Sequence, residues 1–170
     1  MKQQLGFTLL ELMVTVAIAV ILLGIGVPSL NGLFQSMSGD ASANRIMREI
    51  RFARSQAIDL NQTVVICALA SNGSDCGGDA DAGLTVFADD NGNTKREVGE
   101  KVLQAANPFN KAGSTGFVGA INSLSFRSDG LISGNSGRVY FCSNDNSYIK
   151  GVAVSKGGSV RFDTEATCPL

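Results

Sequence analysis

The stretch MKQQLGFTLLELMVTVAIAV, residues 1–20, begins an apolar run that contains a single ionisable side chain. The run extends over 21 residues, from Phe7 to Val27, and its ionisable residue is Glu11. At about 1.5 Å per residue, a helix of this length can cross the apolar core of a bilayer. A carboxylate inside such a helix is costly and usually has a partner. We therefore predict a membrane-spanning helix in which Glu11 has a specific role.

An ordinary secretory signal does not explain this N-terminus. Such a signal has a basic start, an apolar run of about 7–15 residues and a small-residue cleavage site after the run. Lys2 supplies the positive charge, but the apolar run is longer and no such site follows it before Pro28. The small residue Gly6 precedes the run instead. A plain membrane anchor would explain the length of the run, but it leaves Glu11 without a reason.

The composition of the 170 residues limits the classes of function. The chain has 20 glycines and three prolines, which favours a turn-rich β region over disorder. Fourteen basic and 15 acidic residues give a net charge of −1, so no bulk charge indicates nucleic acid or anionic lipid. The chain has no histidine, which removes most metal sites and the Ser-His and Cys-His catalytic pairs. We predict neither enzymatic activity nor a cofactor.

The four cysteines predict disulfide bonds in an oxidising compartment. They are Cys67, Cys76, Cys142 and Cys168, and none forms a CxxC motif. Three pairings are possible, and free buried thiols are the alternative. Pairing between sequence neighbours is the simplest: Cys67–Cys76 would close a short polar loop, and Cys142–Cys168 would hold the C-terminus.

Apolar residues at helical spacing predict that a helix continues beyond the membrane segment to about residue 60. Proline removes a helix hydrogen bond, so Pro28 predicts a kink. Arg45, Arg48, Arg51 and Arg54 lie mainly opposite the apolar face of this helix. Two interpretations remain open for these arginines: a surface that meets acidic groups of neighbouring subunits, or a solvated face.

Short β-branched or alternating runs separated by glycines predict antiparallel strands after residue 62. The predicted strands are residues 63–69, 84–87, 98–103, 123–127, 138–142, 151–154 and 159–162. One long N-terminal helix packed on such a sheet gives an α+β domain.

The segment from Asp89 to Glu100 has a weak likeness to a calcium loop. Asp89, Asn91, Asn93 and Glu100 fall at positions 1, 3, 5 and 12 of an EF-hand loop, but Thr94 occupies the position that requires glycine. The Asp-Asn-Gly sequence also forms a turn without a metal. We favour the turn, and calcium remains the alternative.

The residues Gly6-Phe7-Thr8-Leu9-Leu10-Glu11 resemble the class III signal of type IV pilins and of type II secretion pseudopilins. In that family a prepilin peptidase cuts after the glycine and methylates the new N-terminal residue. The resemblance implies cleavage between Gly6 and Phe7 and methylation of Phe7. Glu11 would then be the fifth residue of the mature chain and would neutralise the N-terminal amine of a neighbouring subunit, because opposite charges attract strongly in low dielectric.

The rest of the chain resembles a GspH/FimT-type pseudopilin domain, most like a FimU-type minor pilin. The resemblance rests on the order of six segments: RSQAI (54–58), VVIC (64–67), FADDNGN (87–93), SFRSDG (125–130), GRVYFC (137–142) and VSKGGSV (154–160). It implies a leader at 1–6, a transmembrane and assembly helix at 7–28, and a periplasmic head at 29–170. The implied location is the bacterial inner membrane, with a single pass, and then the filament or its tip.

The resemblance also implies function and partners. The implied function is a minor pilin that primes or enters a type IV pilus, with adhesion, twitching motility or DNA uptake as uses of that pilus. A minor pseudopilin of a type II secretion system and a DNA-binding pilin for natural transformation are the alternatives. The implied partners are major and minor pilins, the prepilin peptidase and the pilus assembly platform.

Nucleic acid is the disfavoured partner. DNA-binding pilins of this type carry a Gly-Arg-x-Arg motif, and this chain has Gly158-Ser159-Val160-Arg161 in that place. A small basic patch remains conceivable, although two acidic residues, Asp163 and Glu165, oppose it. Its candidate residues are Arg138, Lys150, Lys156 and Arg161.

Overall fold

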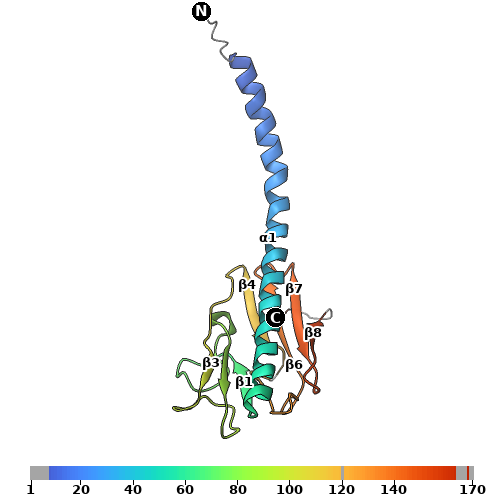
Figure 1. Ribbon diagram of the computed structural model, residues 1–170. Helices are drawn as coiled ribbons and strands as arrows, with labels where there is room; N and C mark the ends of the chain where they lie inside the picture. The colour runs from blue at the N-terminus through green and yellow to red at the C-terminus, as the bar shows by residue number, and fades with distance from the viewer. Residues whose placement is uncertain (1–7, 120, 164–167, 169–170) are drawn as a thin grey trace, which may run out of the picture. The chain divides into compact units, whose positions relative to one another are not determined.

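The computed structural model describes residues 8–119, 121–163 and 168, without the side chains of residues 27–29 and 31. The chain forms two compact units, Met1–Ser36 and Met37–Leu170. Helix α1, Leu9–Leu60, begins in the first unit and ends in the second (Figure 1). The helix passes through Pro28 without ending, and the kink predicted there stays a prediction.

The first unit consists of the apolar part of α1. Leu9–Gly26 has a mean hydropathy of 2.5 and none of its residues is buried, so by length and composition it can cross a membrane. The Thr8 hydroxyl accepts a hydrogen bond from the Glu11 N–H at 3.2 Å, which caps the start of the helix.

In the second unit, α1 buries one face against the head. The buried apolar side chains follow helical spacing: Ala43, Ile46, Met47, Ile50, Ala53 and Ala57. Asn61 ends the helix in a left-handed conformation, with φ of 53°. The Gln62 N–H then reaches the Ala57 carbonyl and the Asn61 N–H reaches that of Ile58, both at 3.2 Å. This pair of bonds is the Schellman motif, which satisfies carbonyls at a helix end.

Two four-stranded antiparallel sheets complete the head. The first has the order β3-β2-β1-β5, with β1 Val64–Cys67, β2 Thr85–Ala88, β3 Val102–Gln104 and β5 Ser123–Phe126. The second has the order β4-β6-β7-β8, with β4 Gly113–Phe117, β6 Gly137–Ser143, β7 Ile149–Val154 and β8 Val160–Asp163. A short 3-10 helix, η1, covers Ala80–Ala82.

One core joins α1 to both sheets. Ile46 and Ile50 of α1 belong to the same buried cluster as Val64, Phe126 and Val139, which lie on strands of both sheets. The α+β class predicted from the sequence is therefore confirmed.

The chain crosses between the sheets three times, after β3, after β4 and after β5. Strands that follow one another in the chain therefore do not pair as hairpins at these crossings. Strand β4 was also missed, because its sequence GSTGF has no alternation of apolar and polar residues.

Candidate functional sites

Glu11 is the residue for which the sequence predicts a role in assembly. Gly6 and Phe7, the residues of the predicted cleavage, lie outside the described residues. The Glu11 side chain is exposed, and no ion pair among the described residues includes it. Its carboxylate is therefore available to a cation from another molecule, and its role in assembly stays a prediction.

The predicted arginine row does not form one uniform face, because three of its four members bind the head. The Arg45 guanidinium donates to the carbonyls of Asn107 and Pro108, at 2.5 and 2.8 Å, and lies 4.3 Å above the centre of the Phe109 ring. Arg54 donates to the Gly130 carbonyl at 3.0 Å. The interpretation of a solvated face is therefore wrong for Arg45 and Arg54.

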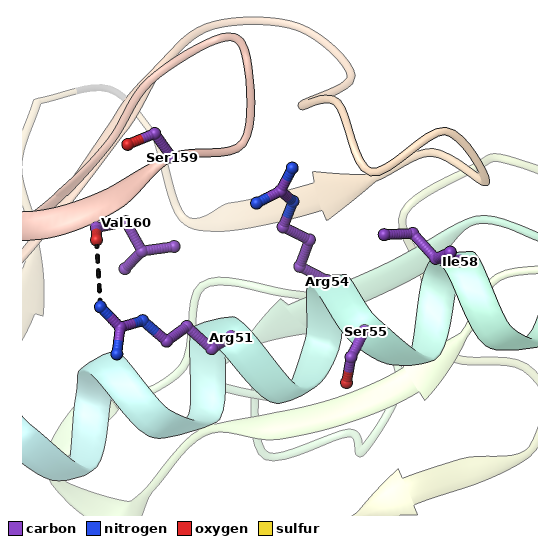
Figure 2. Close-up of a pocket in the computed structure, with 6 residues that line it drawn as sticks. All are labelled: Arg51, Arg54, Ser55, Ile58, Ser159 and Val160. Carbon is purple, nitrogen blue, oxygen red and sulfur yellow. Dashed lines mark hydrogen bonds between the residues drawn. The ribbon is translucent and has the colours of Figure 1, made fainter.

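Arg51 and Arg54 flank a groove between α1 and the start of β8 (Figure 2). Within the part of the chain that the structure describes, the hydrogen bond of Arg51 is a long one, 3.4 Å, to the Val160 carbonyl. Arg48, the remaining arginine of the row, is exposed and does not line this groove. The sequence could not reveal the groove, because its two sides are more than 100 residues apart in the chain.

Glu49 is a buried acidic residue beside Arg45. It is only 5% exposed, and its carboxylate accepts a hydrogen bond from Arg45 Nε at 2.8 Å. Burial raises the pKa of Glu49, and the opposing attraction of Arg45 and Arg48 does not cancel this effect. The carboxylate is therefore less favourable in the folded state than in the unfolded state.

We expect a Glu49→Gln chain to be more stable than wild type at pH 7, with the advantage shrinking as the pH falls through the folded pKa of Glu49 toward about 4.5. Because the pKa of Glu49 is raised in the folded state, Glu49 contributes stability to the wild-type chain below its unfolded pKa of 4.5. That stability is lost as the pH rises through the folded pKa. Pulse proteolysis of the detergent-solubilised chain in urea, at pH 4 and pH 7, measures the difference. A variant that is less stable by the same amount at both values would contradict the sign.

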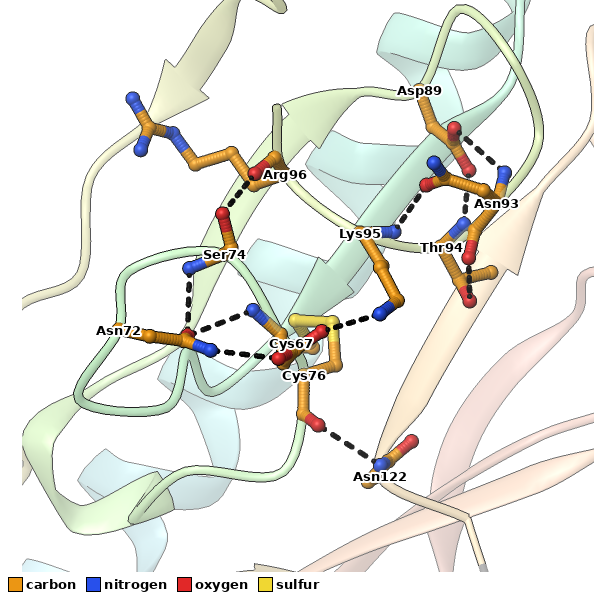
Figure 3. The surroundings of a disulfide bond; sticks show 11 residues. Cys67, Asn72, Ser74, Cys76, Asp89, Asn93, Thr94, Lys95, Arg96 and Asn122 are labelled. Atoms are coloured by element: carbon orange, nitrogen blue, oxygen red, sulfur yellow. Dashed lines mark hydrogen bonds and ion pairs between the residues drawn. A yellow bond between two sulfur atoms is a disulfide. The ribbon is translucent and has the colours of Figure 1, made fainter. Parts of the chain in front are cut away.

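The structure pairs Cys67 with Cys76 and Cys142 with Cys168, with Cα–Cα distances of 5.6 and 5.9 Å. Figure 3 shows the first bond at the end of β1, where the Asn122 side chain donates to the Cys76 carbonyl at 3.1 Å. The surroundings of this bond form a small apolar cluster separate from the main core, with Val65, Cys67, Phe87, Leu69 and Cys76. The second bond links β6 to the C-terminal segment.

The segment 89–100 is a turn held by side-chain oxygens (Figure 3). The buried Asp89 carboxylate accepts hydrogen bonds from the N–H groups of Gly92, Asn93 and Thr94, at 2.8, 3.2 and 2.9 Å. Both Glu100 oxygens accept from N–H groups as well. Thr94 itself takes a positive φ of 60°.

These contacts are the ones that the turn interpretation predicts. The amide oxygens of Asn91 and Asn93 also accept backbone N–H groups. No group of three or more acidic or cysteine side chains in the described part of the chain is placed to hold a metal ion. The oxygens proposed as calcium ligands are thus used within the turn.

The four candidate basic residues do not form one patch. Arg138 and Arg161 flank Ala153 across three strands of the second sheet, and with Lys156 they line a shallow groove. Lys150 is absent from that groove and forms an ion pair with Asp40 of α1. Arg138 Nε also pairs with the Asp163 carboxylate at 3.2 Å. Two of the four charges therefore have an acidic partner within the head, while Glu165 lies outside the described residues.

The Lys150 ion pair belongs to a packed contact between α1 and β7. The Tyr148 hydroxyl donates to Asp40 at 2.7 Å, and Lys150 lies 4.9 Å from the centre of the Phe162 ring. Hydrogen bonds from Lys150 and Tyr148 lower the pKa of Asp40. A Cβ on the neighbouring Gly39 would lie 2.2 Å from the Tyr148 ring, so the absence of a side chain at this position leaves room for the ring.

Comparison with known proteins agrees with this geometry. The model of the family "Prokaryotic N-terminal methylation motif" matches residues 1–27, and that of "Type II transport protein GspH" matches residues 42–158. The methylation motif, the apolar helix and the two-sheet head define a pilin or pseudopilin. Because the second match covers more than half of the chain, the protein belongs to the type II transport protein GspH family.

Two kinds of solved structure share the fold. The Pseudomonas aeruginosa type IV minor pilin FimU has a TM-score of 0.55 at 16% identity, over 77% of this chain and 92% of that one. The Vibrio cholerae minor pseudopilin EpsH, from the Type 2 Secretion System, has a TM-score of 0.52 at 12% identity, over 74% and 96%. No curated protein sequence matches this chain significantly. The recognition of a type IV pilin or pseudopilin with a GspH-type domain from the sequence is confirmed.

Proposed function

We propose that the protein is a minor pilin, a non-enzymatic subunit that primes or enters a type IV pilus. The observation that carries this proposal is the methylation motif at residues 1–27, which runs into an exposed apolar helix containing Glu11. In the head, Arg45, Arg138 and Lys150 form ion pairs and Asp89 holds a turn, which are structural uses of these charged side chains.

The proposed assembly uses the charge of Glu11. Cleavage after Gly6 creates a cationic amine at Phe7, and methylation keeps that charge. A carboxylate four residues further along the helix then neutralises the amine of a neighbouring subunit, and the pairing sets the axial register of the two helices. Before assembly the subunit resides in the inner membrane with its head in the periplasm, where the disulfides form.

The same pairing of Glu11 with the amine of a neighbouring subunit would also assemble a minor pseudopilin of a type II secretion system. The family match and the likeness to EpsH support this second candidate. The two candidate functions differ in the assembly that the subunit enters, a pilus or a type II secretion system. Affinity purification of the cross-linked full-length chain from its host therefore distinguishes them. Co-purification with pilus subunits supports the first candidate, and co-purification with secretion-system components supports the second.

The experiment that tests the pilin proposal is mass spectrometry of the intact chain from its native host. We expect a mature chain that begins at methylated Phe7, because the peptidase cuts after the glycine. A Gly6→Leu chain should stay at full length. A mature wild-type chain that begins near Pro28 would show an ordinary signal peptide and would contradict the proposal.

A further inference from the structure

The groove beside α1 is built from two segments that are distant in sequence. Its lining comprises Arg51, Arg54, Ser55 and Ile58 of α1 together with Ser159 and Val160 at the start of β8. The groove has a volume of about 530 Å³. In Figure 2 the Arg51 and Arg54 side chains both extend from the helix toward the segment that carries Ser159 and Val160.

The Arg54 guanidinium is held in place by two glycine turns. Its Nε donates to the Gly130 carbonyl, and both Gly130 and Gly158 have positive φ, 75° and 74°. A Cβ on Gly158 would lie 2.1 Å from the Gly130 carbonyl oxygen and 2.8 Å from Arg54 Nε. The turns therefore approach each other and the arginine closely only because both positions are glycine. This arrangement fixes the direction in which the rest of the guanidinium points.

The groove presents more hydrogen-bond donors than the described head uses. Arg54 Nε donates a hydrogen bond to the Gly130 carbonyl, and one guanidinium nitrogen of Arg51 donates a long hydrogen bond to the Val160 carbonyl. Among the described residues, neither arginine forms an ion pair with a carboxylate. Ser159 is exposed beside them. Planar guanidinium groups with free donors match the geometry of a carboxylate or phosphate.

We propose that this groove receives the carboxylate of an acidic side chain on a neighbouring subunit of the filament. The inference rests on the proposed pilin function. An open groove with two cations holds a free anion weakly, because exposed charge pairs contribute little. In a filament, a carboxylate on an adjacent subunit is held close to the groove, so its effective concentration is high. A weak ion pair then fixes the orientation of one head relative to the next.

Charge complementarity favours an acidic protein surface over a nucleic acid. Duplex DNA needs many cations along its backbone for binding at physiological salt. Two other arginines of the head already have acidic partners: Arg127 pairs with Asp129, and Arg138 pairs with Asp163. Two available guanidinium groups suit one carboxylate better than a run of phosphates.

Site-specific photocrosslinking of the full-length chain in its host tests the proposal. A photoreactive phenylalanine analogue replaces the exposed Ser55 on the groove wall. We expect a cross-link to a peptide of another subunit that contains Asp or Glu. Its yield should fall at least fivefold in Arg51→Gln/Arg54→Gln and at least threefold in Arg51→Gln alone. Arg48→Gln, one turn away and outside the groove, should leave the yield unchanged.

Each other outcome of this experiment either supports or overturns the groove proposal. Arg51→Gln should fold, because Arg51 is exposed and makes only one long hydrogen bond in the described head, and disulfide formation in each variant verifies folding. If the chain enters filaments but the cross-link yield does not change when both arginines are replaced, the groove proposal fails and the pilin function stands. If the chain never enters filaments, both fail. Duplex binding at physiological salt that is lost in the double variant would assign the groove to phosphate and overturn the carboxylate.

Discussion

A chain carrying Glu11→Val should reach the membrane and be processed at wild-type levels, while its amount in sheared filaments should fall at least tenfold. Removal of a membrane carboxylate eases insertion, so the defect must arise at a later step. Loss of one partner from a desolvated ion pair costs about 3–5 kcal/mol, and each tenfold change corresponds to about 1.4 kcal/mol. Immunoblots of membrane and sheared fractions give both amounts.

Two variants of the same helix make this result specific. Thr15→Val also removes a polar side chain, whose hydroxyl bonds only the Leu12 carbonyl at 2.9 Å in the described structure, and we expect it to assemble normally. Glu11→Asp keeps the charge on a shorter side chain and should restore part of the incorporation. Normal incorporation of Glu11→Val would remove the pairing role that we assign to Glu11.

The second large effect is on the free energy of unfolding, which a Gly83→Ala change should lower by about 3 kcal/mol or more. Gly83 ends η1 with φ of 106° and ψ of 167°, a conformation that is nearly restricted to glycine. A Cβ there would also lie 2.1 Å from the Asn107 carbonyl oxygen, which is backbone and cannot rotate away. Asn107 is in turn a partner of Arg45, so the strain would reach α1.

Gly73→Ala is the matched control for Gly83→Ala. Gly73 also has a positive φ, 70°, but nothing lies within 4 Å of the Cβ that alanine would add. We expect a loss of only about 1 kcal/mol from the backbone conformation alone. Pulse proteolysis of both variants in urea measures the two losses. Equal losses would show that the contact with Asn107 has no energetic importance.

Some features were predictable because their signals lie within a few residues of one another. The apolar run around Glu11, the helix end at Asn61 and the β-branched strand β1 each depend on adjacent residues. The turn at Asp89 is local as well, since its carboxylate binds N–H groups only three to five residues away. For the same reason the sequence predicted a turn there ahead of a calcium site.

The tertiary structure alone decided the order of the strands and the partners of the charged side chains. The sequence offered Lys150 and the four arginines as candidate surface cations, but Lys150 meets Asp40 from 110 residues away and Arg54 meets Gly130 from 76 residues away. Strand β4 has no apolar alternation and exists because β6 supplies its hydrogen-bond partners. Local sequence determined the helix, the membrane segment and most strands, because short-range sterics and hydrophobic periodicity suffice for them. Contacts across such separations depend on how the whole core closes, which no short stretch of the chain encodes.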